Sequence, residues 1–191
     1  ELNKLTEIAG TDITVEVRIA TPKGRAVYDL SAKFGAVPDE AAALLKEANA
    51  RGCRTAIAFH VGSQCLDPAA FHVAIELAAK VRDQAGVPLD YLEVGGGFPA
   101  AYRMNVPPLQ AYFDTIAGAR DAFGFDIPLL AEPGRALVAE ACSVLTQVHL
   151  RKGDDLYIND GIYGCLSEIR DGDLDPPVRA ISKAGPVAGD I

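Results

Sequence analysis

The stretch TAIAFHVGS, residues 55–63, decides the fold that we expect for this chain. Its first part, Thr55 to Phe59, is short and almost wholly apolar, which is the composition of a parallel strand buried on both faces. The sequences on either side, 38–50 and 68–85, carry apolar residues at helical spacing and are followed by glycines. A buried strand between two amphipathic helices predicts a parallel α/β domain.

The alternation of strands and helices continues over the first two thirds of the chain. The sequence patterns predict strands at 12–19, 55–60, 89–94, 128–131, 142–150 and 155–158, and helices at 38–50, 68–85 and 107–123. We expect the last helix to pack through Leu109, Phe113, Ile116 and Phe123. Periodicity alone leaves a barrel and a doubly wound sheet both open.

Composition excludes several classes of protein. The chain has 18 basic and 26 acidic residues, a net charge of −8 and no basic stripe, so we expect no nucleic-acid partner. No apolar run approaches the ~18 residues of a membrane span, and no signal peptide is visible. The four cysteines lack C-x-x-C spacing, which favours a soluble protein of the reducing cytoplasm.

Polar or glycine-rich groups begin at the points where apolar strands are predicted to end. These groups are His60–Ser63, Gly95–Gly97, Glu132–Arg135 and Asn159–Gly161. The strand ends of an α/β barrel share one face, and active sites are built on that face. The four groups therefore predict a single site.

Three consecutive glycines, Gly95 to Gly97, allow backbone N–H groups to approach an anion such as a phosphate. A tight turn that requires positive φ explains the same run without any ligand. Arg135 carries a permanent positive charge on a planar fork that suits a phosphate, although an arginine after a Pro-Gly turn is often only a solvated residue at a helix start. An anion site and a structural turn both remain open at this point.

Glu132 is predicted to follow a buried strand, where an ionised carboxylate needs a partner. A cationic ring nitrogen or a salt bridge to Arg18 would provide one. His60 is a candidate for acid/base catalysis, metal binding or stacking on an aromatic ring, or is an ordinary core residue. No second ligand lies at metal-binding spacing around it, so we expect no metal.

Six segments in this order resemble the ornithine/lysine decarboxylase group of fold-type III pyridoxal-phosphate enzymes, whose barrel is of the alanine racemase type. They are R-I-A-T (18–21), S-A-K-F-G (31–35), H-V-G-S-Q (60–64), G-G-G-F-P (95–99), E-P-G-R (132–135) and N-D-G-I-Y-G (159–164). The resemblance implies a (β/α)₈ barrel, present here in part. Residues 1–165 would be its latter part, and 166–191 would begin the connection to a largely missing C-terminal β-domain.

The resemblance also implies a cofactor, pyridoxal 5′-phosphate, and roles for individual residues. His60 would stack on the cofactor ring and Glu132 would bind its pyridine nitrogen, and both count as catalytic. Ser63, the glycine triplet and Arg135 would contact the phosphate, and Arg18 would lie close to the cofactor. The complete set of implied cofactor-binding residues is Arg18, His60, Ser63, Gly95, Gly96, Gly97, Glu132, Gly134 and Arg135.

The reaction implied is the decarboxylation of a basic amino acid, ornithine or else lysine, to a diamine in polyamine biosynthesis. The family's active sites are shared between two subunits, so a homodimer is expected. Asp171, in an acidic stretch after N-D-G-I-Y-G, and Tyr163 are the candidate substrate-binding residues. A non-catalytic homologue similar to antizyme inhibitors, and a related decarboxylase with another substrate, are the alternatives.

Two family features are not found in the sequence. One is the Schiff-base lysine on an early barrel strand, and the other is the G-x-x-C-D segment that completes the active site from a partner subunit. The lysines present are Lys4, Lys23, Lys33, Lys46, Lys80, Lys152 and Lys183. Since a complete barrel needs about 250 residues, we expect the 191-residue chain to represent part of a longer protein.

Overall fold

The structure, a computed structural model, describes residues 1–22, 26–28, 33–172 and 175–182. Ser31 and Ala32 of the S-A-K-F-G segment lie outside the described residues. The chain divides into two compact units. Unit 1 comprises Glu1–Ala100 and Val106–Ala141, and unit 2 comprises Ala101–Asn105 and Cys142–Ile191. The predicted domain boundary after residue 165 concerns the full-length protein and stays a prediction.

A parallel sheet forms the centre of unit 1. Its strands, hydrogen-bonded in this order, are β1 (Thr14–Arg18), β3 (Arg54–Ala58), β5 (Leu92–Glu93) and β6 (Leu129–Leu130). In the register of the sheet Val17 pairs with Ile57, Ile57 with Leu92, and Leu92 with Leu129. Each connection between neighbouring strands contains a helix, which allows consecutive strands to run in the same direction. The predicted parallel α/β domain is confirmed.

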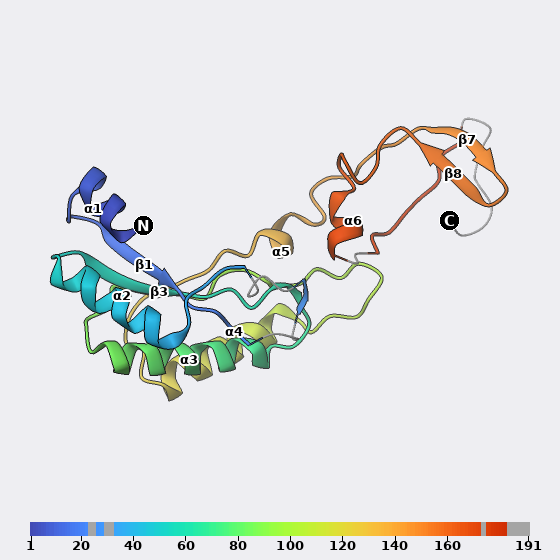
Figure 1. The fold of residues 1–191 in the computed structure, drawn as a ribbon. Coiled ribbons are helices and arrows are strands. Elements are labelled where there is room, and N and C mark those ends of the chain that lie inside the picture. Colours follow the sequence, from blue (N-terminus) through green and yellow to red (C-terminus); the bar gives the residue numbers. More distant parts are fainter. Residues whose placement is uncertain (23–25, 29–32, 173–174, 183–191) are drawn as a thin grey trace. The chain divides into compact units, whose positions relative to one another are not determined.

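Three helices cover one face of this sheet. Helices α2 (Pro38–Ala50), α3 (Ala69–Ala85) and α4 (Leu109–Ala122) lie side by side there (Figure 1). Their buried positions are rich in alanine, whose small side chain lets a helix approach its neighbours closely. Helix α3 buries the predicted residues Phe71, Ile75, Ala78 and Val81. Strand β1 turns Val15 and Val17 into this core and leaves Glu16 and Arg18 on the opposite face.

The predicted packing face of α4 is wrong in part. Ile116 is buried, but Leu109 and Phe113 are 37% and 49% exposed, and the buried face is completed by Tyr112 and Ala119. The aromatic ring of Tyr112 meets Phe71 edge-on, with the ring centroids 5.9 Å apart. The predicted residue Phe123 does pack against the core. The sequence of α4 offers two stripes at helical spacing, and the one that contains Tyr112 faces the buried aromatic on α3.

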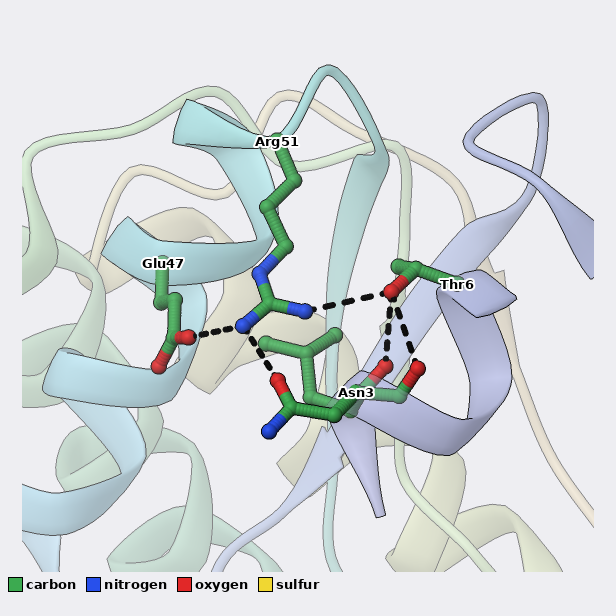
Figure 2. A network of polar contacts seen from close by, with 5 residues as sticks. Asn3, Thr6, Glu47 and Arg51 are labelled. Carbon is green, nitrogen blue, oxygen red and sulfur yellow. Dashed lines mark hydrogen bonds and ion pairs between the residues drawn. The ribbon is translucent and has the colours of Figure 1, made fainter.

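A polar network joins the first helix, α1 (Leu2–Ala9), to the end of α2. Arg51 donates to the hydroxyl oxygen of Thr6 at 3.1 Å, binds the side-chain oxygen of Asn3 and forms an ion pair with Glu47 (Figure 2). Arg51 also caps α2, because its backbone N–H donates to the carbonyl oxygens of the last turn. One arginine thus fixes α1 against α2 through its planar donors.

A short antiparallel ladder lies beside the parallel sheet in unit 1. Strand β2 (Ala26–Tyr28) pairs with β4 (Ser63–Cys65), with Ala26 opposite Cys65 and Tyr28 opposite Ser63. Strand β4 follows the H-V-G turn directly. The chain between β3 and α3 therefore contains an extended segment, β4, before the helix begins.

Unit 2 contains an antiparallel hairpin of β7 (Val148–Lys152) and β8 (Asp155–Ile158), followed by α6 (Ser167–Gly172). The strand predicted at 142–150 begins only at Val148. At Gln147 the N–H donates to the Asn159 side-chain oxygen, while the Gln147 carbonyl oxygen still accepts from the Asn159 N–H. Strand β8 matches its prediction, but it is not a strand of the parallel sheet. In the part of the chain that the structure describes, no helix has the length and apolar character needed to cross a membrane.

The buried Tyr112 provides a test of the core. Its hydroxyl donates to the Cys65 carbonyl oxygen at 2.7 Å, and burial raises the pKa of Tyr112 to about 12, so the phenol stays protonated. Tyr112→Phe would leave this carbonyl without its partner, and we expect a loss of about 1–3 kcal/mol in the free energy of unfolding, measured with urea. Tyr157→Phe, at a side chain 48% exposed, is the control, and equal losses in both variants would contradict the assignment.

Candidate active site

The carboxyl ends of the four parallel strands place three polar groups on one edge of the sheet. The H-V-G-S turn follows β3, the glycine triplet follows β5, and E-P-G-R follows β6. The fourth group, Asn159–Gly161, follows β8 in unit 2 and does not belong to this edge of the sheet. The prediction that all four follow strands of one parallel sheet is therefore wrong for that group, because β8 pairs with β7.

Each glycine of the triplet packs directly against the backbone of a neighbouring turn. A Cβ atom added at Gly95, Gly96 or Gly97 would lie 2.2, 2.7 or 2.4 Å from the carbonyl oxygen of Phe59, Glu132 or Gly62, respectively. Gly95 and Gly97 also have φ values of +65° and +100°. The glycines are thus required by the turn and by close packing, so the structural interpretation holds whatever the turn binds.

The hydrogen bonds of the triplet engage two of its carbonyl groups, whereas two of its N–H groups have no acceptor among the described residues. Gly95 accepts from the N–H of Glu132 at 2.8 Å, and Gly97 accepts from the N–H of Cys65 at 2.9 Å. Among the hydrogen bonds of the described residues, none has the N–H of Gly96 or Gly97 as its donor. Because buried backbone donors normally find a partner, and Gly96 is buried, this turn has the properties of an anion-binding site.

Arg135 and Ser63 lie together at the same edge. The guanidinium Nε and Nη2 atoms donate to the Ser63 hydroxyl oxygen at 3.3 and 3.0 Å, although the two residues are 72 positions apart in the sequence. Arg135 belongs to the short helix α5 (Gly134–Val138), which begins within E-P-G-R. The structure thus brings together two of the residues predicted to contact a phosphate.

His60 presents a neutral ring next to the glycine turn. Its Nδ1 accepts from the N–H of Gly62 at 3.0 Å, which leaves Nε2 as the protonated nitrogen, 3.0 Å from where a Cβ would stand at Gly96. Burial lowers the pKa of His60, as does the charge of Arg18, whereas the charge of Glu132 raises it. A neutral flat ring fixed from Nδ1 provides a surface for stacking.

Three carboxyl groups meet on the face of the sheet that the helices do not cover. Glu93 shares side-chain hydrogen bonds with Glu16 and with Glu132. Burial, together with the hydrogen bond and charge of Glu16 and then the charge and hydrogen bond of Glu132, raises the pKa of Glu93 to about 7. Glu93 and Glu16 can meet because Ala56 and Ala58, on the strand between them, have only methyl side chains.

The expected environment of Glu132 needs correction. Its side chain is exposed in this structure, so burial does not require it to have a partner. In the described residues no ion pair joins it to Arg18. The Arg18 guanidinium instead lies over the ring of Phe34, 5.2 Å from its centroid. The carboxylate of Glu132 therefore remains available for a cation from outside the chain.

The candidate substrate residues belong to unit 2. Tyr163 is 95% exposed there, and Asp171 lies in α6 with its side chain outside the described residues. Their role in substrate binding stays a prediction. In the described ranges no group of three or more His, Cys, Asp or Glu side chains is arranged to bind a metal ion.

Sequence reasoning did not single out Glu16, Glu93 or Gln64. The first two occupy alternate positions in T-V-E-V-R and Y-L-E-V, where a carboxylate between buried apolar residues indicates the opposite face of the strand. That signal was present in the sequence. The contacts of Gln64 depend on a segment 36 residues away and have no local signature.

The fold and edge define a class: a parallel α/β domain whose carboxyl edge presents N–H groups of a glycine turn, a guanidinium, a flat imidazole and a carboxylate. In comparisons with known families, the one described as pyridoxal-dependent decarboxylase, pyridoxal binding domain, matches residues 1–139. The chain is 39% identical over 180 residues to the lysine/ornithine decarboxylase of Selenomonas ruminantium and 36% identical over 181 residues to the ornithine decarboxylase of Schizosaccharomyces pombe.

The solved structures agree with this match. The lysine/ornithine decarboxylase of Vibrio vulnificus complexed with putrescine superposes with a TM-score of 0.78 at 30% identity, over 95% of this chain and 50% of that chain. Matches cover 88% of this chain but only 45% and 40% of the Selenomonas and Schizosaccharomyces proteins. The chain belongs to the fold-type III pyridoxal-dependent decarboxylases, in the ornithine/lysine decarboxylase group, and includes their pyridoxal-binding domain.

The raised pKa of Glu93 predicts a pH-dependent stability. The folded state keeps a proton on Glu93 up to about pH 7, whereas an unfolded glutamate loses it near its ordinary pKa of about 4.3. The stability that Glu93 contributes is therefore present below that ordinary pKa and is lost as the pH rises through about 7. We expect thermal unfolding of the full-length protein to show this decline, and Glu93→Gln to reduce it.

Glu76→Gln is the matched control, because the hydrogen bond and charge of Lys80 lower the pKa of this exposed carboxylate. A ¹³C titration of the glutamate carboxyl groups would assign the group directly. If Glu93→Gln and the parent lost stability equally between pH 5 and pH 8, Glu93 would not be the group that titrates in that range.

Proposed function

We propose that the full-length protein carrying this chain binds pyridoxal 5′-phosphate and decarboxylates a basic amino acid, ornithine or lysine, to a diamine. The observation that carries the proposal is the juxtaposition, at one sheet edge, of the glycine turn, the Arg135–Ser63 pair and the carboxylate of Glu132. The names of the relatives support the reaction and the substrate class.

The phosphate end of the cofactor suits the glycine turn. The N–H groups of Gly96 and Gly97, the guanidinium of Arg135 and the hydroxyl of Ser63 are donors that a dianion accepts, and none of them carries a negative charge. Arg135 and Ser63 are already hydrogen-bonded to each other, so little reorganisation is needed for both to face the same anion. Gly134 contributes by starting α5 without a side chain.

The ring end of the cofactor suits Glu132 and His60. A carboxylate at the ring nitrogen holds a proton there, and bound pyridoxal phosphate then supplies an electron sink for the electron pair left when CO₂ departs. His60 stays neutral because its pKa is lowered by burial and by Arg18, so it adds no positive charge that would compete for Glu132. Arg18 contributes its charge from the end of β1.

The protonated Glu93 assists Glu132 in this role. A carboxyl group with a pKa of about 7 keeps its proton over much of the neutral range. It can donate a hydrogen bond to the Glu132 side chain without adding a second negative charge, and this hydrogen bond helps to orient Glu132 toward the ring nitrogen.

Arg135→Ala tests the phosphate site. The variant loses a charged donor, and hydrogen bonds to charged groups contribute about 1.5–3 kcal/mol, so we expect pyridoxal phosphate to bind about 10- to 100-fold more weakly. The control is Arg120→Ala, which removes a half-exposed arginine of α4 that pairs with its neighbour Asp121. Titration by absorbance gives both affinities. Unchanged affinity in Arg135→Ala would remove this residue from the site.

The substrate class is tested with ornithine, lysine and norvaline, which lacks the terminal amine. If a carboxylate such as that of Asp171 faces the ammonium group, loss of the ammonium leaves that carboxylate unpaired, and kcat/KM should fall by about 10⁴-fold. Asp171→Asn should weaken the use of ornithine and leave norvaline unaffected. Asp175→Asn is the control, because Asp175 pairs with Arg103 at 3.6 Å. Similar rates for ornithine and norvaline would point to a related decarboxylase with another substrate.

A further inference from the structure

Gln64 has no part in the proposed chemistry, yet it is almost completely buried, with 1% of its surface exposed. Its Nε2 donates to the carbonyl oxygen of Ala100 at 2.7 Å, and the N–H of Ala100 donates to its Oε1 at 3.0 Å. A single side-chain amide therefore binds both backbone polar groups of one residue, as an adjacent β-strand would.

The neighbours of Gln64 bind the rest of the same edge. Ser63 accepts the hydrogen bonds of Arg135, and the N–H of Cys65 donates to the carbonyl oxygen of Gly97 at 2.9 Å. Each residue of β4 thus binds a different segment: Ser63 binds E-P-G-R, Cys65 binds the end of the glycine triplet, and Gln64 binds the residues that follow the triplet. Gly97 and Ala100 are the two anchored ends of a four-residue segment, and Gln64 supplies the second anchor.

The backbone of Gln64 adds an independent observation. Its φ is +55°, and it is the one residue other than glycine with a positive φ in the described ranges. Such a conformation is unfavourable for a residue with a side chain and persists where surrounding contacts hold it in place. Glycine would adopt this conformation more easily but would have no amide to bind Ala100.

We propose that Gln64 is a positioning residue for the phosphate-binding edge: by holding Ala100 it fixes the path of Gly95–Gly97 and hence the direction of their N–H groups. This inference rests on the proposed function, because it assumes that the glycine turn receives a phosphate. It predicts that Gln64 affects the binding of the phosphate group and leaves the recognition of the pyridine ring unchanged.

The test compares pyridoxal phosphate with pyridoxal, which has the same ring and no phosphate, in the full-length protein. Gln64→Met keeps the volume and loses both hydrogen bonds, and Gln64→Gly relieves the positive φ and also loses both. We expect each variant to bind pyridoxal phosphate about tenfold or more weakly, the range typical of groups that orient ligand contacts, and to bind pyridoxal as the parent does. Gln84→Met is the matched control, because Gln84 donates to Asp39 on the exposed side of the helices.

Gln64→Asn gives a milder variant should the others fold poorly, because it keeps a neutral amide and tolerates the positive φ, but its shorter side chain cannot make both hydrogen bonds to Ala100. The same selective loss is expected, with folding followed by circular dichroism. If a variant bound both ligands more weakly by the same factor, the role of Gln64 would be merely structural and the inference would be overturned. It would also be overturned if the variants bound both ligands as the parent does. If the parent itself bound the two ligands equally well, the phosphate site of the proposed function would fail first.

Discussion

The contact of backbone with backbone at the glycine triplet is the constraint on which the rest of this edge depends. Gly95, Gly96 and Gly97 each approach a carbonyl oxygen of another turn more closely than any Cβ would permit. Because the turns after β3, β5 and β6 lie this close, the N–H of Glu132 reaches Gly95, and the N–H of Cys65 reaches Gly97. The positions of Arg135, Ser63 and His60 relative to one another follow from those contacts.

The parallel arrangement supplies the other half of the geometry. Strand β6 leads to Glu132, and β5 carries Glu93, so two acidic groups from neighbouring strands meet beside the position proposed for the cofactor ring. Their mutual repulsion is relieved by a proton that stays on Glu93. The end of the edge proposed to bind the phosphate contains cationic and neutral donors, whereas the other end is acidic. This polarity along one edge suits a ligand with an anion at one end and a basic nitrogen at the other.

Much of this was predictable from local sequence. The strand TAIAF, the helix at 38–50 and the glycine turn carry their own periodic or conformational signals, and each lies where it was predicted. The packing face of α4 was predicted only in part, because Tyr112 is buried against Phe71 of α3. The environment of Glu132 was not predicted either, since its contact with Glu93 joins residues of two strands that are far apart in the sequence. The hydrogen bonds of Gln64 join residues 36 positions apart, beyond the range of any periodicity.

The close packing of the triplet also limits how this domain can diverge. A side chain at Gly95 or Gly97 would displace the turn after β3, and one at Gly96 would displace the turn after β6, so each replacement would require the backbone of a neighbouring turn to move. The residues proposed to face the substrate, Tyr163 and Asp171, belong to the other unit. Changes aimed at substrate preference would therefore be made at positions other than the three glycines, and the glycine turn would be kept as an invariant module.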